Sequence, residues 1–445
     1  KKMMLNACNA GANGYMIDLE DSMSPTTQNV IDAHSNLHDL FRKTLSFEKY
    51  DSDGHLEKLY RLPKELPTLM VRHRGLHMRE NLMVDSNNLG IPAAIFDIGL
   101  HLFHNGKLLE EQQKGIYFYT PKLESYEDAI FMNHLFTEGL KLLNISPGQL
   151  KTTVLIETYP AIYQTDEIVH ALKDYIVGLN CGRWDYLYSM LKETDIFLPH
   201  KTDLHMQQPF MESYVRQIVN TCQQRNLYPM GGMSAVLPSK DENKNKINLQ
   251  KIQTDKELEI HRGCRGAWVA HPDLVQPIQK MFSEHSNTPV STTTRFPISK
   301  SELEKIYFTR LPDTKENIRI ALVYISSWLN GVGAVAIDNV MEDLATAEIS
   351  IHQIRQILQK DLITKEELDS MIQDVSQSLP KLHKKTVSVL LSYLIHESHL
   401  FLTNVHSLST PMDDSPSQTV SFAVDKVRRL LGSRGHKTGL ELTTI

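Results

Sequence analysis

Two short apolar runs of this chain each lead to a carboxylate. Residues 153–158 contain Glu157, and residues 179–186 contain Asp185, 28 positions later (185 − 157). That spacing leaves room for one helix, at about 161–175, between two parallel strands. Converging carboxylates repel each other unless a cation lies between them, and their oxygens suit Mg²⁺. The pair therefore predicts a Mg²⁺ site, against the simpler alternative of one helix cap and one ion pair with a basic residue.

Five more charged side chains lie at the ends of the first two predicted strands. Asp18, Glu20 and Asp21 follow one another closely, and the alternation of a strand places Asp18 and Glu20 on one side. The same alternation directs Arg72 and Arg74 inward together, where a cation needs a carboxylate or an anionic ligand. The alternative is that the acids cap helices and pair with a lysine. Their gathering on one rim with the metal pair favours a site for an anion and a metal ion.

The turn that precedes Asp185 has a composition suited to substrate binding. It reads Asn-Cys-Gly-Arg-Trp at residues 180–184. Gly182 permits a close approach of the backbone, and the exposed amides of such a turn can hold a carboxylate. We therefore expect the turn to bind a carboxylate beside the metal ion.

These groups can meet only if the strands that carry them lie side by side. Runs rich in β-forming residues occur at 15–20, 68–74, 93–99, 115–122, 153–157, 176–182, 228–234 and 263–271. Eight strands with mostly helix-sized connections match an α/β protein of the (β/α)8 TIM-barrel class, which places its chemistry at the carboxyl ends of its strands. The alternative is an open doubly wound sheet, but no Gly-x-Gly-x-x-Gly follows the first strand.

The pattern of the chain changes after the eighth run. Residues 286–300 are rich in Ser, Thr, Asn and Pro and predict a linker. Almost all of the sequence beyond them has a helical pattern. We therefore expect a TIM-barrel catalytic domain at residues 1–285 and a helical C-terminal domain at residues 301–445.

Three features of the C-terminal part support this reading. Residues 315–329 have an amphipathic pattern, and Thr364 with Glu367 has the spacing of a capping box. Residues 331–343 lie between the first two predicted helices and run from Gly-rich to apolar to acidic. A segment of this composition that leads into a helix is a candidate functional loop.

Composition and charge exclude several classes of function. The hydrophobic content of 41% with 22% charged residues is typical of a globular protein, and the net charge of −6 argues against a nucleic-acid partner. The longest apolar runs are too short to span a membrane. The four cysteines lack paired or metal-type spacing, which predicts a reduced, intracellular protein. Because the first residue is Lys1, we expect an N-terminal segment to be missing.

Eight motifs, taken in order, identify a resemblance. They are 18–26 (DLEDSMSPT), 71–77 (VRHRGLH), 95–99 (IFDIG), 155–158 (LIET), 178–186 (GLNCGRWDY), 230–233 (MGGM), 268–273 (WVAHPD) and 341–350 (MEDLATAEIS). Through them the chain resembles the malate synthases of isoform A type over nearly its whole length.

The resemblance implies a TIM barrel followed by a helical C-terminal plug. It implies the condensation of acetyl-CoA with glyoxylate and water to give malate and CoA, in the glyoxylate cycle. Matched motif by motif, it implies these roles: Glu157 and Asp185 as Mg²⁺ ligands, Asp18 and Glu20 as outer-sphere acids, Arg72 as the catalytic arginine, Asp343 as the catalytic base, Gly182, Arg183, Trp184 and Asp185 as the glyoxylate cradle, and Trp268 and Pro272 as part of the acetyl-CoA channel.

Two departures and two alternatives accompany the resemblance. The family's N-terminal helical segment is absent, and Leu344 stands where a smaller residue is expected beside the base. The alternative functions are a citramalyl- or malyl-CoA lyase, which the long C-terminal domain disfavours, and a non-catalytic relative that acts as a binding protein. A location in the cytoplasm, or in peroxisomes or glyoxysomes of a eukaryote, is compatible with the sequence, although the chain does not end in Ser-Lys-Leu. The sequence does not decide between Arg72 and Arg74. It also does not identify the group that activates the hydrolytic water or the oligomeric state.

Overall fold

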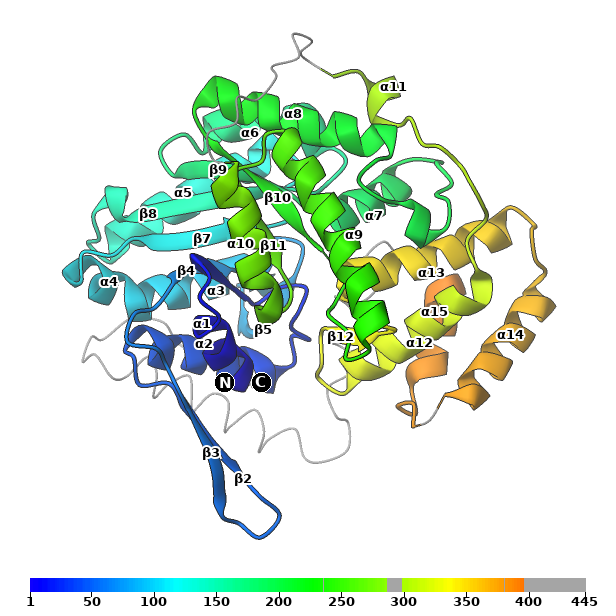
Figure 1. The fold of residues 1–445 in the computed structure, drawn as a ribbon. Helices are drawn as coiled ribbons and strands as arrows, with labels where there is room; N and C mark the ends of the chain where they lie inside the picture. Colours follow the sequence, from blue (N-terminus) through cyan, green and yellow to red (C-terminus); the bar gives the residue numbers. More distant parts are fainter. Residues whose placement is uncertain (235, 286–297, 380, 396–445) are drawn as a thin grey trace.

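The computed structural model describes the chain except for residues 235, 286–297, 380 and 396–445 (Figure 1). Its centre is a curled parallel sheet of seven strands. In spatial order these are β1 (Gly14–Asp18), β4 (Thr68–Arg72), β7 (Ile116–Thr120), β8 (Leu150–Ile156), β9 (Ile176–Cys181), β10 (Tyr228–Ser234) and β11 (Gly266–Val269). Each neighbouring pair is parallel, and the strands follow one another in chain order, as in a TIM barrel.

Seven of the eight predicted strands are confirmed, and the third is wrong. Residues 93–99 begin the helix α3 (Ala93–His101), which follows a small hairpin of β5 (Arg79–Val84) and β6 (Gly90–Pro92). A short, continuous apolar run fits a buried helix as well as a buried strand. Pro92 ends the hairpin and occupies the N-cap position of α3. The run at 93–99 is therefore a buried helix and not a strand.

Helices cover the outer face of the sheet, and the main core lies between the two layers. They are α1 (Lys2–Cys8), α2 (Thr27–Phe41), α4 (Lys107–Glu111), α5 (Tyr126–Leu142), α6 (Thr165–Ala171), α7 (Arg183–Glu193), α8 (Pro209–Arg225), α9 (Glu242–His261) and α10 (Val275–Glu284), with the shorter turns η1 (Leu102–Gly106), η2 (Pro147–Gln149), η3 (Ala161–Gln164), η4 (Lys201–Asp203) and η5 (Pro272–Leu274). The helix expected at 161–175 is present as η3 and α6. A hairpin of β2 (Ser46–Tyr50) and β3 (Leu56–Arg61) projects away from the body (Figure 1).

The described part of the chain beyond the barrel is mainly helical. It contains α11 (Lys300–Leu303), α12 (Thr314–Leu329), α13 (Leu344–Gln359), α14 (Lys365–Ser378) and α15 (Thr386–Ile395). The predicted amphipathic helix is α12, whose Ile318, Leu322 and Ile325 are fully buried in a second core. The predicted capping box at Thr364 and Glu367 is also present. Most of the expected linker, and residues 396–445 of the expected C-terminal domain, lie outside the described residues.

The candidate functional loop folds into a short hairpin on the barrel. Its strands are β12 (Val335–Ile337) and β13 (Val340–Glu342), and the two turn residues between them have positive φ angles. The backbone N–H of Leu237, which follows β10, donates to the carbonyl of Asn339 over 2.9 Å. The hairpin is thereby held against the loop that follows β10.

The start of this loop is fastened to the segment after β1. The hydroxyl of Ser24 donates to the carbonyl of Trp328 over 2.9 Å, and the side-chain amide of Asn29 donates to the carbonyl of Gly331 over 2.8 Å. A Cβ atom at Gly333 would lie 2.6 Å from the carbonyl carbon of Met23. The loop therefore packs backbone against backbone over the carboxyl end of β1.

Within the described ranges, no helix combines the length and apolar character needed to cross a membrane.

We expect Gly333→Ala to destabilise the protein by about 1–3 kcal/mol, because the added methyl group meets fixed backbone of Met23 and Ser24 rather than a flexible side chain. Thermal unfolding would measure the loss. Gly148→Ala is the matched control, since no heavy atom lies within 4 Å of its added Cβ. Equal melting temperatures for the two variants would contradict the close packing of the loop.

Candidate active site

Glu157 and Asp185 meet at the carboxyl ends of two adjacent parallel strands. Glu157 directly follows β8, and Ile156 pairs in register with Cys181 at the end of β9. Asp185 was predicted at a strand end, but it lies in the first turn of α7 because the strand stops before Gly182. A Cβ at Gly182 would lie 2.6 Å from the Cβ of Glu157. Only glycine lets the turn approach Glu157 so closely.

Lys122 is the cation around which the carboxylates gather. Its Nζ lies 2.8 Å from Asp185 Oδ1, 2.8 Å from Asp21 Oδ2, 3.1 Å from Glu20 Oε1 and 3.5 Å from Glu157 Oε1. The backbone N–H of Lys122 also donates to Glu157 over 2.9 Å. Sequence reasoning placed Lys122 at the end of a strand but gave it no role. Its position at the same rim as the acids was the available signal.

Arg72, the last residue of β4, binds the acids of the β1 end. Its Nε and Nη2 donate to the two oxygens of Asp18 at 2.6 and 2.5 Å. Its Nη1 lies 3.4 Å from Glu20 Oε2 and 3.7 Å from Asp21 Oδ2. Asp18 and Glu20 thus face the same cation. Asp21, to which no separate role was assigned, is a full member of the group.

Arg74 belongs to a different ion-pair network, so the expectation that it points inward with Arg72 is wrong. It forms a forked pair with Asp97 of α3, with Nη2 2.8 Å from Oδ1 and Nε 3.0 Å from Oδ2. Its Nη1 lies 2.8 Å from Glu80 of β5. The strand β4 ends at Arg72, so the alternation of side chains does not extend to Arg74. The geometry favours Arg72 as the arginine of the site.

This group of charged side chains, which we call the rim cluster, has more acids than bases. It consists of the acids Asp18, Glu20, Asp21, Glu157 and Asp185 and the cations Arg72 and Lys122. Burial raises the pKa of Glu20 and of Asp185, and neighbouring carboxylates raise both further. Burial would also raise the pKa of Asp21, but Lys122 and Arg72 lower it to about 2. The cluster therefore has more acids than its two cations can pair with, and the raised pKa values of Glu20 and Asp185 favour the neutral forms of these two acids.

The donor set of the rim cluster fits a hard divalent cation. Oε2 of Glu157 is buried and has no hydrogen-bond partner within the described part of the chain, and the surplus carboxylate oxygens are ligands of the kind that Mg²⁺ takes. In this structure four of the carboxylates point toward the ammonium group of Lys122. Among the described residues, only Asp51, Asp53 and His55, exposed at the tip of the β2–β3 hairpin, bring three ligand atoms within 4.8 Å of one another.

Asp343 approaches the rim cluster from the C-terminal part of the chain. It is the N-cap of α13, where its Oδ1 accepts the backbone N–H of Thr346 over 3.2 Å and completes a capping box. Burial and the negative charge of Asp21 raise the pKa of Asp343 to about 6, while Arg72 acts in the opposite direction. Asp343 therefore lies within electrostatic reach of two members of the rim cluster.

The remaining predicted residues lie in three places. Arg183 and Trp184 share the first turn of α7 with Asp185, and the guanidinium carbon of Arg183 stacks 4.9 Å from the centre of the Trp184 ring. Trp268 lies on β11, where its indole N–H donates to the hydroxyl of Tyr119 over 2.9 Å. Pro272 is exposed in η5.

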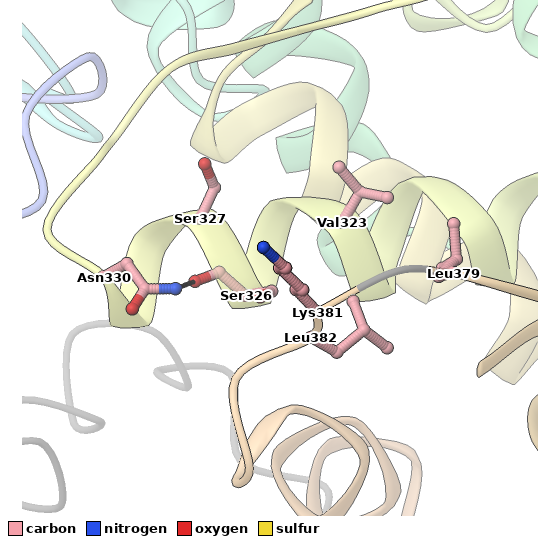
Figure 2. A pocket seen from close by; sticks show the side chains of 7 residues that line it. All are labelled: Val323, Ser326, Ser327, Asn330, Leu379, Lys381 and Leu382. Atoms are coloured by element: carbon pink, nitrogen blue, oxygen red, sulfur yellow. Dashed lines mark hydrogen bonds between the residues drawn. The ribbon is translucent and has the colours of Figure 1, made fainter. Parts of the chain in front are cut away.

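A pocket of about 360 Å³ lies elsewhere, on the surface of the helical part (Figure 2). Its lining comes from the second half of α12 with the residue after it and from the segment that follows α14, namely Val323, Ser326, Ser327, Asn330, Leu379, Lys381 and Leu382. None of the predicted site residues lines it. The candidate site is therefore the rim cluster and not this pocket.

Comparison with known proteins identifies the family. A model described as malate synthase, TIM barrel domain, matches residues 68–303, and one described as malate synthase, C-terminal, matches residues 311–391. The malate synthase of Dictyostelium discoideum is 34% identical over 96% of this chain and 81% of its own length. The chain belongs to the malate synthase family. Malate synthase A of Escherichia coli (strain K12) is 39% identical over 80% of this chain and 68% of its own length.

These matches confirm the predicted family, the TIM barrel with a C-terminal domain, and the prediction of an acyltransferase-type enzyme. A solved structure, the Haloferax volcanii malate synthase in its pyruvate/acetyl-CoA ternary complex, has the same fold. It superposes with a TM-score of 0.52 at 15% identity and covers 85% of this chain and 92% of its own.

The two arginines should respond differently to substitution by lysine. Arg74→Lys loses the forked contacts to Asp97 and Glu80, so we expect it to lower stability by roughly 1–3 kcal/mol with turnover retained. Arg72→Lys loses its own forked contact to Asp18, so we expect a comparable loss of stability, but in this variant most of the turnover should be lost as well. Thermal unfolding and initial rates of both variants would measure this. Equal losses of turnover would contradict the assignment of Arg72 to the site.

Proposed function

We propose that this chain catalyses the Mg²⁺-dependent condensation of acetyl-CoA with glyoxylate and the hydrolysis of malyl-CoA to malate and CoA. One observation carries the proposal: bonds from Ser24 and Asn29 to Trp328 and Gly331 hold the loop that leads to Asp343 against the segment after β1, where Asp21 and Arg72 act on its charge. The names of the relatives, malate synthase and malate synthase A, support the same reaction. We also propose the domain limits 1–285 and 301–445, joined by a linker at 286–300.

The first chemical requirement is removal of a proton from the methyl group of acetyl-CoA. A thioester methyl group is a weak carbon acid, so the reaction needs a placed carboxylate and a cation beside the developing enolate oxygen. Asp343 is the proposed base, since a pKa of about 6 leaves it ionised at neutral pH and more basic than an ordinary carboxylate. Arg72, which is always charged, is the proposed partner of the enolate oxygen.

The second requirement is a fixed and activated aldehyde. Glu157 and Asp185 would hold Mg²⁺, with Asp18 and Glu20 as outer-sphere acids, and the bound ion would supply polarisation of the glyoxylate carbonyl. The amides of the turn at Gly182 and the side chains of Arg183 and Trp184 would orient the glyoxylate carboxylate. Trp268 and Pro272 would line the path of acetyl-CoA.

The reaction itself is tested by the release of CoA from acetyl-CoA. We expect release that requires both glyoxylate and Mg²⁺ and that yields free malate. Cleavage of malyl-CoA to acetyl-CoA and glyoxylate, without malate formation, would instead indicate a lyase. Binding of acetyl-CoA without any turnover would indicate a binding protein.

The metal site predicts a specific effect of Mg²⁺ on stability. Mg²⁺ that binds only the folded protein should stabilise it by about 2.7 kcal/mol at 100 times its Kd. Asp185→Asn should abolish this shift, weaken glyoxylate binding and abolish turnover, with the metal-free protein near its original stability. Asp51→Asn, in the exposed group on the β2–β3 hairpin, is the control and should keep the shift. A full Mg²⁺ shift in Asp185→Asn would refute the ligand assignment.

The base assignment predicts that Asp343→Asn abolishes both turnover and the exchange of acetyl-CoA methyl protons with deuterated water. Mg²⁺ and glyoxylate should still bind, and asparagine should still cap α13. In the unsubstituted protein the exchange rate should fall as the pH drops through about 6, because the protonated carboxyl cannot accept a proton. Near-normal exchange in Asp343→Asn would leave Asp343 as a cap only and direct the search to Asp18 or Glu20.

A further inference from the structure

A short barrel segment, Pro199–Asp203, binds several parts of the helical domain at once. The carbonyl of Pro199 accepts the side-chain amide of Gln353 over 2.8 Å. Nε2 of His200 lies 2.9 Å from Oε2 of Glu316 at the start of α12. The segment lies between α7 and α8 of the barrel, so these bonds join the two parts of the chain independently of the rim cluster.

Lys201, in the middle of this segment, has the densest set of contacts. Its Nζ lies 3.2 and 3.0 Å from the two oxygens of Glu342, 3.1 Å from the carbonyl of Thr346 and 3.2 Å from Oγ of Ser350. The Lys201 and Glu342 side chains are only 13% and 4% exposed. A largely buried ammonium group with acceptors on every side holds these groups in one arrangement.

The groups that Lys201 holds are those that surround Asp343. Glu342 precedes Asp343 in the chain, and Thr346 forms the capping box with it. Glu342 also acts on Asp343 through its charge, since this neighbouring carboxylate is one of the causes that raise the pKa of Asp343. Lys201 therefore holds the side chain that precedes Asp343 and the backbone carbonyl of Thr346 that follows it, and it pairs with the charge of Glu342.

We propose that Lys201 is a positioning residue for Asp343, which holds the start of α13 against the barrel so that the carboxylate of Asp343 faces the rim cluster. The inference rests on the proposed role of Asp343 as the base. It goes further in making the placement of Asp343 depend on Lys201, a residue of the barrel that we propose touches neither substrate nor metal. Because His200 and Pro199 have their own bonds to the helical part, loss of the Lys201 ammonium should leave the two parts associated.

The test compares Lys201→Met, Lys201→Arg and Lys141→Met in the full chain. Methionine keeps the length of the side chain without its charge, arginine keeps the charge, and Lys141 is a highly exposed lysine of α5. We expect Lys201→Met to lower kcat on the order of 10- to 100-fold through misplacement of the base, with KM for glyoxylate nearly unchanged. Lys201→Arg should recover most of the loss, and Lys141→Met should behave as the unsubstituted protein.

A pH profile distinguishes this role from a purely structural one. Asp343 is faced by Asp21 from the end of β1, Arg72 from β4, Glu342 from β13 and Tyr324 from α12. Without Lys201 the Glu342 charge acts on Asp343 uncompensated. The acid limb of kcat/KM should therefore move to higher pH in Lys201→Met, and the double variant Lys201→Met/Glu342→Gln should move it back.

The outcomes separate this inference from the proposed function. Turnover and a pH profile unchanged in Lys201→Met, or a loss that appears only as a lower melting temperature, would overturn the positioning role while the reaction stands. If Lys201→Met fails to fold, Lys201→Arg and the double variant still test the role. Full turnover in the double variant, or an acid limb that stays at higher pH without the Glu342 charge, would overturn it. Absence of glyoxylate-dependent CoA release from the unsubstituted protein would overturn the proposed function itself.

Discussion

The site depends on an excess of negative charge held in a buried place. Five carboxylates of the rim cluster face Arg72 and Lys122, and a low dielectric makes the repulsion among the acids costly. The barrel supplies this arrangement because parallel strands end at one rim, and Gly182 removes the side chain that would keep Glu157 away. A divalent cation among these oxygens would relieve the repulsion and favour the ionised forms of the acids, as the proposed Mg²⁺ site requires.

The helical part of the chain brings one acid, Asp343, near enough to the barrel rim for Asp21 and Arg72 to act on its charge. Asp343 lies at the N-terminus of α13, where the helix dipole favours a negative charge. Burial and the acids nearby act in the opposite direction and raise its pKa to about 6. These opposed effects give a carboxylate that is ionised at neutral pH but more basic than one exposed to water. In the proposed mechanism the orientation of this carboxylate matters as well as its basicity, and the bonds of Lys201 to Glu342 and Thr346 are proposed to hold it.

Sequence reasoning found the elements whose signal is local and missed those whose partners are distant. Glu157 was placed correctly because β8 has a clear apolar run, and the family motifs supplied the rest. Asp185 was expected at a strand end although the predicted strand stopped at residue 182, and the helix α7 begins at once after Gly182 and carries Asp185 in its first turn. Lys122 was missed because its four carboxylate partners come from three separate segments, and Arg74 was misplaced because alternation ceases where β4 ends.

Capping and base catalysis by Asp343 were treated as competing readings, but the structure makes them compatible. The capping bonds from Thr346 fall on Oδ1 of Asp343, so the cap does not require Oδ2. A carboxylate whose first oxygen is held by a helix N-terminus has a fixed orientation for its second oxygen, which is what removal of a proton from a bound substrate needs. The cap also limits how far burial can raise the pKa of Asp343, since the bond from the Thr346 N–H lowers it. In this reading the cap is part of the catalytic apparatus: asparagine would preserve the orientation and lose only the basicity.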